Sequence, residues 1–224
     1  MPLERTTSKI SSETLIDQSK INSEETINYL KNNNLETLGD LEGMNSMCYI
    51  EGVDKDFYLH SKSYDLDFDI ETVWDGYMTV PPSTSWCGSK LSFSFAFDSK
   101  PRNISYAGDK YDGLKDNQLI FIVIKLLFGF FKLAVTHYVS KISAKEKLVK
   151  LCYVEGGKSS GSQYIRFEKL EKNKTRVIHD TRYKSDSKFR DEKLYPLLHE
   201  MIINQFHNNV KKYLISDYRP QLVS

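Results

Sequence analysis

Hydrophobic and polar residues alternate in four successive runs in the second half of the chain, and these runs are rich in β-branched and aromatic residues. Alternation of this kind places the apolar side chains on one face and is typical of half-buried strands. Short polar or glycine-rich connections separate the runs, which predicts an antiparallel meander. The predicted strands cover residues 135–142, 148–154, 163–170 and 175–183.

The period of the pattern changes after the fourth run. Over residues 189–214 the apolar positions recur at helical spacing, so we expect one long amphipathic helix. Its apolar face would pack across the concave side of a curved sheet, and that arrangement can enclose a pocket. The predicted apolar face consists of Leu194, Leu198, Met201, Ile202, Phe206, Val210 and Tyr213.

The first half of the chain predicts further strands at 56–66, 91–97 and 103–106. Between the first two, Asp69 has the side chain of a helix N-cap, and we expect a short helix over residues 70–78. The run 91–97 alternates so strictly that its phenylalanines are predicted to share one face of a half-buried strand.

The apolar run from Leu119 to Val135 has about the length that spans a bilayer. Lys125 and Lys132 interrupt it, and each would cost about 2.5–3.5 kcal/mol in hydrocarbon. We therefore expect a buried strand that turns near Phe128-Gly129 into the next strand, and no integral membrane protein. Peripheral membrane contact is the intermediate possibility.

The N-terminal part of the chain has weaker patterns. Residues 1–22 contain few large apolar residues and are expected to be disordered or loosely attached. Ser23 can cap a short helix over residues 24–31, and residues 35–54 have little periodicity and are expected to be irregular. These patterns predict an N-terminal extension at 1–50, a folded domain at 56–214 and a C-terminal tail at 215–224.

Composition and charge narrow the classes of partner. The chain of 224 residues has 31 basic and 30 acidic residues and a net charge of +1, which argues against nucleic acid as a main partner. The cysteines are Cys48, Cys87 and Cys152, an odd number at no metal-like spacing. Without an N-terminal secretion signal they are expected to be reduced in a cytoplasmic protein, with Cys152 as a small core residue.

The predicted order of elements resembles the START-like (SRPBCC) helix-grip superfamily, which includes the polyketide cyclase/dehydrase-like proteins. The resemblance is carried by Tyr64–Asp75, in which Val73-Trp74 falls in the first short helix, by Thr175–Ile178 and by the helix at 189–214. It implies an α+β fold in which a curved antiparallel sheet wraps around a long C-terminal helix. Relative to that superfamily, the segment Trp86–Tyr111 is an insert that could cover the cavity or reshape its mouth.

A second, fainter similarity joins residues 118–183 to a bacterial helix-grip family of unknown function. Its carriers are an aromatic-glycine pair before a strand, a hairpin with a tyrosine and glycines, and a strand with an Arg-Phe pair. In this chain they are Phe128-Gly129, Cys152–Gly157 and Arg166-Phe167.

Two histidines are predicted to face the cavity. His137 shares a strand face with Val135 and Val139, and His179 shares one with Val177 and Tyr183. A histidine pair beside a tyrosine could perform acid–base chemistry. No third orienting group stands at a recognisable spacing, so we favour a pair of polar cavity residues that orient a ligand or are satisfied by water or backbone groups. The five histidines have no metal-ligand spacing, and His199 and His207 are expected on the more solvated part of the helix, so no metal or cofactor is predicted.

Aromatic side chains supply more apolar surface than a flat sandwich needs, and part of it is expected to line the cavity. We therefore expect binding of a hydrophobic or amphipathic small molecule, lipid-like or aromatic. The alternatives are a cyclase/hydratase-type enzyme that uses the same cavity, and a ligand-free protein-interaction domain with a filled core. The predicted ligand-binding residues are Trp74, Phe93, Phe95, His137, Tyr153, Phe167, His179, Tyr183 and Phe206.

Overall fold

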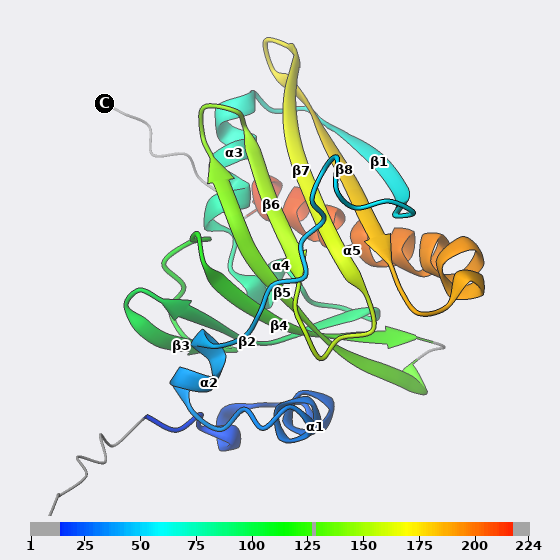
Figure 1. Cartoon of the computed structure of the whole chain (residues 1–224). Helices are drawn as coiled ribbons and strands as arrows, with labels where there is room; N and C mark the ends of the chain where they lie inside the picture. The colour runs from blue at the N-terminus through cyan, green and yellow to red at the C-terminus, as the bar shows by residue number, and fades with distance from the viewer. Residues whose placement is uncertain (1–13, 127–128, 217–224) are drawn as a thin grey trace, which may run out of the picture.

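One antiparallel sheet of eight strands, in the order β1-β8-β7-β6-β5-β4-β2-β3, forms the frame of the protein (Figure 1). The computed structural model describes residues 14–126 and 129–216. All four strands expected in the second half are present, and each pairs with its neighbour in the chain. The strands are β1 (Tyr58–Leu66), β2 (Leu91–Ser99), β3 (Arg102–Tyr106), β4 (Gln118–Leu126), β5 (Phe131–Ser143), β6 (Leu148–Tyr153), β7 (Ser160–Glu171) and β8 (Lys174–Lys184).

The helices cover both faces of the sheet. The long helix α5 (Tyr195–Ser216) crosses the concave face beside α3 (Ile70–Thr79) and α4 (Pro82–Ser85), whereas α1 (Glu24–Asn32) and α2 (Leu38–Glu42) lie against the other face (Figure 1). A π-helical turn at Arg190–Leu194 leads into α5. A curved antiparallel sheet around a long C-terminal helix is the helix-grip architecture that the sequence predicted.

Local capping chemistry starts two of the helices where the sequence indicates. The Ser23 hydroxyl accepts the backbone N–H of Thr26 at the start of α1. The Asp69 carboxylate accepts the N–H groups of Glu71 and Thr72 at the start of α3. Each cap satisfies backbone donors that have no partner within the helix.

The main core lies between the concave face and the helices α3, α4 and α5. Ile165 and Phe167 of β7 and Val177 of β8 point into it, as alternation predicted, and they meet Trp74 of α3 and Phe206 of α5. The Phe167 ring stands edge-on to Trp74, with ring centroids 5.4 Å apart. Because the helices cover this face, its side chains are shielded from water except where a pocket remains.

A second core lies on the outer face, and it corrects one prediction. The pairing of β2 with β4 shifts register between Phe93 and Phe95. A bulge of this kind inserts one extra residue, so the alternation reverses beyond it. Phe93 therefore faces the main core, whereas Phe95 and Phe97 belong to the outer core. The prediction that these phenylalanines share one face is wrong.

The N-terminal segment forms the other half of this outer core. Ile16 and Ile21 are buried there together with Leu30 of α1 and Leu41 of α2. The expected loose attachment of residues 1–22 is therefore wrong for residues 14–22, because apolar side chains anchor them; residues 1–13 lie outside the described residues. Residues 35–54 contain α2 in addition to irregular chain.

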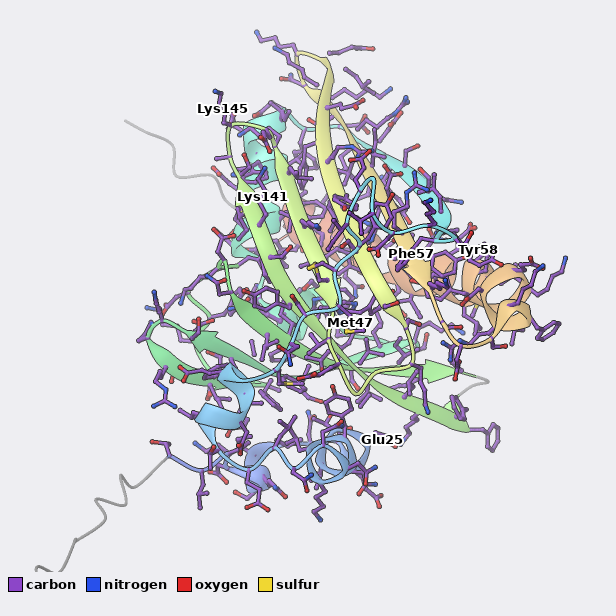
Figure 2. The ribbon with its side chains drawn as sticks, in the orientation of Figure 1. Glu25, Met47, Phe57, Tyr58, Lys141 and Lys145 are labelled. Atoms are coloured by element: carbon purple, nitrogen blue, oxygen red, sulfur yellow. A yellow bond between two sulfur atoms is a disulfide. The ribbon has the colours of Figure 1, made fainter. Side chains whose placement is uncertain are left out.

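A strap of residues 45–50 then crosses the outer side of the sheet, where Met47 is visible over its strands (Figure 2). Met47 accepts the N–H of Gly161 and donates its own N–H to the Tyr153 carbonyl, so it joins β7 to β6. A disulfide between Cys48 and Cys152 fastens the strap. The prediction of reduced cysteines is wrong for this pair. Since disulfides are typical of oxidising compartments, the cysteine-based argument for a cytoplasmic location loses its basis.

The apolar run after residue 118 forms the two paired strands β4 and β5. The expected turn at Phe128-Gly129 lies partly outside the described residues. Among those described, no helix is long and apolar enough to span a membrane. The expected insert Trp86–Tyr111 contains β2 and β3, which extend the sheet at one edge. Most of the proposed tail at 215–224 lies outside the described residues.

Candidate functional site

A pocket of about 410 Å3 lies between the first turns of α5 and the inner face of β4, β5, β6 and β7. Most of its wall is aliphatic, and its polar groups come from four elements that meet at the same place. The aliphatic part includes Ile124, Leu126, Leu133, Val135, Leu198 and Ile202. The polar part includes His137, Tyr153, Gln163, Tyr195 and His199.

All five histidines of the chain gather beside this pocket. His179 of β8 has its ring 5.1 Å from that of His207 and 5.6 Å from that of His199. The ring of His60 of β1 lies 5.1 Å from that of His199. Gln163 of β7 hydrogen-bonds both to His179 and to His137 of β5. Side chains of α5 therefore join the neighbouring strands β1 and β8, and Gln163 of β7 extends the cluster to β5.

The buried face of α5 includes predicted residues such as Ile202 and Phe206, but it is not the predicted face throughout. His199 and His207 are also buried, whereas Met201 is 40% exposed. The buried stripe extends to the histidines because these can hydrogen-bond to one another and to β8. The expectation that His199 and His207 lie on a solvated part of the helix is wrong.

A directed chain of hydrogen bonds runs through the cluster. The Gln163 Oε1 atom, which can only accept, lies 2.9 Å from His179 Nε2, so that nitrogen carries a proton. In a neutral imidazole the other nitrogen then accepts, and His179 Nδ1 lies 2.8 Å from His207 Nε2. His207 therefore donates through Nε2 and accepts the Tyr77 hydroxyl through Nδ1, at 2.6 Å.

The other end of the Gln163 amide reaches the pocket. Its Nε2 atom can only donate, and it lies 2.8 Å from His137 Nε2 and 3.3 Å from the Tyr153 hydroxyl. The Tyr153 hydroxyl also hydrogen-bonds to that of Tyr195. A single glutamine side chain thus orients both a histidine and a tyrosine of the pocket wall.

Burial keeps these groups uncharged. Desolvation lowers the pKa of His137 to about 4 and that of His179 to about 3. It also lowers the pKa values of His199 and His207 well below the usual range. For Tyr153, desolvation raises the pKa to about 12. The buried histidines and Tyr153 are therefore neutral near neutral pH.

Two cationic side chains, those of Arg190 and Lys158, also line the pocket, and the buried Nε atom of Arg190 has no hydrogen-bond partner among the described residues. Arg190 donates to the Lys158 carbonyl and lies 3.8 Å from the Asp186 carboxylate. The Lys158 side chain is exposed. Glu200 sits 2.5 Å from Lys62 and near His60, at the outer end of the histidine cluster. Among the described residues no group of histidine, cysteine or acidic side chains has the arrangement of a metal site.

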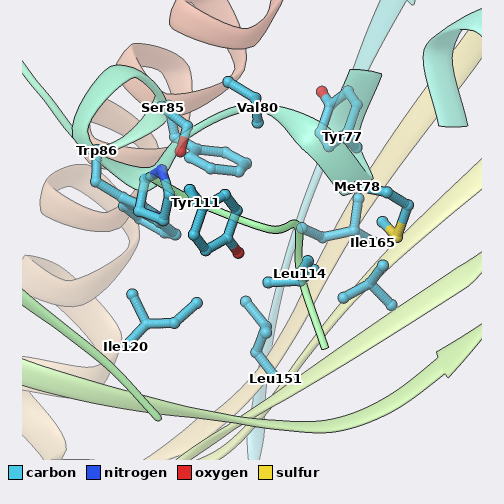
Figure 3. A pocket seen from close by; sticks show the side chains of 13 residues that line it. Tyr77, Met78, Val80, Ser85, Trp86, Tyr111, Leu114, Ile120, Leu151 and Ile165 are labelled. Atoms are coloured by element: carbon cyan, nitrogen blue, oxygen red, sulfur yellow. The ribbon is translucent and has the colours of Figure 1, made fainter. Parts of the chain in front are cut away.

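A smaller hollow of about 30 Å3 lies beyond this site, below α3 and α4 (Figure 3). Tyr111 and Leu114 close over it, and their labelled side chains face Trp86 and Ile120 in the close-up (Figure 3). The Trp86 ring stacks 5.8 Å from that of His137 and lies 4.3 Å from that of Phe206. Trp86 and Phe206 thus stand between this hollow and the large pocket.

The predicted site residues separate into five groups. His137 and Tyr153 line the large pocket, and Phe206 lines the small hollow. Trp74, Phe93 and Phe167 are packed in the main core and line neither space. His179 and Tyr183 are buried behind the wall, and Phe95 lies on the outer face of the sheet.

Tyr183 and His179 do not line the pocket but contact residues that do, namely Tyr195 and Gln163. The Tyr183 ring stacks on Tyr195 at 3.6 Å, and its hydroxyl donates to the Asp191 carbonyl.

Sequence reasoning missed Gln163, Tyr195 and His199. Gln163 lies on the predicted inward face of its strand, next to Ile165 in the alternation, and a buried amide at that position is the one signal that could have identified it.

The comparisons with known proteins show the fold. No family model matches the chain, and no curated protein matches it in sequence. Norcoclaurine synthase from Thalictrum flavum, solved in complex with dopamine and hydroxybenzaldehyde, is similar with a TM-score of 0.52 and 12% identity, over 78% of this chain and 100% of that one. The KanY protein has a TM-score of 0.52 and 12% identity, over 72% of this chain and 100% of that chain. A conserved protein from Geobacillus kaustophilus has a TM-score of 0.50 and 16% identity, over 72% and 98% of the two chains.

The likeness to these structures confirms the helix-grip fold, a curved antiparallel sheet around a long C-terminal helix. Identities of 12–16% carry the likeness no further than the fold.

Proposed function

We propose that this protein binds a hydrophobic or amphipathic small molecule in the pocket between its sheet and α5. The observation that carries the proposal is the composition of the wall, in which aliphatic side chains surround a small group of polar side chains that hydrogen bonds orient. Pockets for small molecules in proteins have this composition, because apolar area supplies affinity and a few polar groups fix orientation.

The size of the pocket supports the same function. Its volume of about 410 Å3 falls in the range of about 300–1,000 Å3 that is usual for small-molecule sites. Each Å2 of apolar ligand surface that enters such a wall contributes about 25 cal/mol. A ligand that buries a few hundred Å2 therefore gains several kcal/mol before the costs of ordering are subtracted.

The state of the polar groups favours binding over acid–base catalysis. An efficient proton-transfer group has a pKa near the working pH. Burial instead lowers the pKa of His137 to about 4 and raises that of Tyr153 to about 12. Across the neutral pH range Tyr153 therefore keeps its proton and His137 does not take up a second one. Both side chains are suited to hydrogen bonding with a ligand. The norcoclaurine synthase structure adds that the same fold can hold aromatic small molecules.

A pair of adjacent leucines tests the proposal. Leu198 lines the pocket, whereas Leu197 is 69% exposed and lines none of it. Leu198→Trp places a larger ring in the pocket and is expected to weaken binding at least about tenfold, because the added side chain occupies ligand volume. Leu197→Trp is the matched control and is expected to leave affinity within about twofold.

The measurement is native mass spectrometry of the purified protein and of the two variants, with organic extraction and identification of any bound molecule. Isothermal titration with a panel of hydrophobic probes gives the affinities. No bound molecule, together with no probe that binds the unmodified protein, would refute the proposal. Equal losses in both variants would place binding elsewhere on the protein.

A further inference from the structure

Both charged side chains in the wall of the large pocket are cations. Lys158 lies in the connection between β6 and β7, and Arg190 begins the π-helical turn before α5. No acidic side chain of the described residues lines the same pocket. The two cationic residues are in contact, because the Arg190 Nη2 atom donates to the Lys158 carbonyl. The wall therefore carries its positive charge at one place.

Neither cation is neutralised by a close carboxylate. The Lys158 side chain is exposed and forms no ion pair with a described residue. Asp186 is the one acidic partner of Arg190 in the described part of the chain, and its carboxylate lies 3.8 Å from Nη2, beyond hydrogen-bond distance. The Asp186 side chain is also 86% exposed, and ion pairs so open to water contribute little. The guanidinium can therefore bind a further anion.

The terminal part of Arg190 is the part that a ligand can reach. Its Nε atom is buried and is closed to a ligand. Nη2 already donates to the Lys158 carbonyl, whereas Nη1 has no hydrogen-bond partner among the described residues and is not buried. Nη1 of Arg190 and the Lys158 ammonium are thus two accessible, positively charged donors in the pocket wall.

The rest of the wall suits an apolar body. Most of it consists of aliphatic side chains, among them Leu133, Leu198 and Ile202. His137 and Tyr153 are buried and neutral, so a charge placed beside them would lose its hydration without gaining an opposite charge. A negative group beside Lys158 and Arg190 would instead keep part of its hydration and gain two opposite charges.

We propose that the ligand is an amphipathic anion, with an apolar body in the aliphatic part of the pocket and one carboxylate, or another oxyanion, paired with Lys158 and Arg190. The guanidinium fork and the ammonium group both donate charge-assisted hydrogen bonds to oxyanions. This inference rests on the proposed function of the same pocket, to which it adds the chemistry of the head group.

Three ligands with the same eight-carbon chain isolate the charge of the head group. They are octanoate, 1-octanol and octylammonium, each titrated calorimetrically into the full chain. Octanoate is expected to bind about tenfold more tightly than 1-octanol, because charge-assisted hydrogen bonds are about twice as strong as neutral ones. Octylammonium is expected to bind more weakly than 1-octanol, because its charge has the sign of the wall. Added salt screens the charges and is expected to narrow these differences.

Charge reversal at Lys158 tests the site, since this exposed side chain can be changed without disturbing the core. Lys158→Glu is expected to lower octanoate affinity at least about tenfold and to raise octylammonium affinity. Lys188→Glu is the matched control, because the Lys188 side chain is 80% exposed, stands two positions from Arg190 and does not line the pocket. It changes the net charge equally and is expected to leave all three affinities within about twofold.

The outcomes separate the two proposals. Failure of all three ligands to bind the unmodified protein would contradict the proposed function itself. Octanoate that binds no more tightly than 1-octanol would overturn this inference and leave the pocket's binding role standing. Equal losses of octanoate affinity in Lys158→Glu and Lys188→Glu would overturn it as well, because they would show an effect of net charge alone. A loss confined to Lys158→Glu, with a gain for octylammonium, is the result that supports it.

Discussion

Lowering the pH from about 7 to about 5 is expected to destabilise this protein through its buried histidines. In the folded state, desolvation holds the pKa of His137 at about 4 and that of His179 at about 3, against about 6.5 for an exposed histidine. In the unfolded chain both rings take up protons as the pH falls through about 6.5. The unfolded state therefore binds more protons, and stability decreases as the pH falls.

The size of the effect follows from the two shifts. Between pH 7 and pH 5 each unfolded ring becomes almost fully protonated while its folded counterpart remains neutral. The linkage relation then gives a loss of about 2 kcal/mol for each of His137 and His179. Since a typical domain is stable by about 5–15 kcal/mol, a loss of about 4 kcal/mol is a large part of the total. The loss continues until the pH reaches the folded pKa values.

The assay is urea unfolding at the two pH values, which avoids the range below about pH 5 where carboxylates titrate. His137→Phe is expected to reduce the difference in unfolding free energy by about 2 kcal/mol, whatever it does to stability at pH 7. His60→Gln is the control: burial lowers the pKa of His60, but the Glu200 carboxylate opposes the shift, so a smaller reduction is expected. Equal stability at pH 7 and pH 5, or an unchanged difference in His137→Phe, would refute the argument.

Three further predictions concern the frame around the site. Cys48→Ser removes the disulfide that closes a loop of 104 residues and is expected to lower the free energy of unfolding, measured with heat or urea, by about 4–5 kcal/mol. Cys87→Ser changes an exposed free cysteine and is expected to leave stability unchanged, so equal stabilities of the two variants would contradict the prediction. Gly161→Ala places a Cβ 1.9 Å from a β8 carbonyl oxygen, at a residue with a φ of +132°, and is expected to lower the unfolding free energy by over about 3 kcal/mol. The control Gly43→Ala is expected to lower it by less than about 1 kcal/mol, and similar losses in the two variants would contradict the prediction. Phe95→Ala is expected to cost about 3–5 kcal/mol yet leave probe affinity within about twofold, and a large change in affinity would show that the outer core affects the pocket.

Patterns that depend on neighbouring residues were predicted well. The caps at Ser23 and Asp69 and the strands from β5 to β8 follow from local hydrogen bonding and from alternation of side chains. The transition from strand to helix period predicted α5 and, with it, the helix-grip arrangement. In each case the chemistry that specifies the element lies within a few residues of chain.

Predictions of which face a residue occupies were less secure. One extra residue in the pairing of β2 with β4 moves Phe95 to the outer face, and nothing in the strictly alternating sequence indicates it. The outer core itself depends on apolar residues such as Ile16 and Ile21, which are too widely spaced to form a pattern. Their burial requires a sheet surface that exists only after β2, β4 and β5 have paired.

The functional site shows most clearly the difference between what local patterns predict and what only long-range contacts determine. The sequence indicated His137 and His179 as inward-facing residues, because the period of a strand is a local property. It did not indicate that His60, His199 and His207 join them, or that Gln163 orients His137, since these contacts join residues 26 to 139 positions apart. Hydrogen bonds between buried polar groups form only where the packing of sheet and helix brings the partners together, so the protonation of the pocket wall depends on the folded arrangement as a whole.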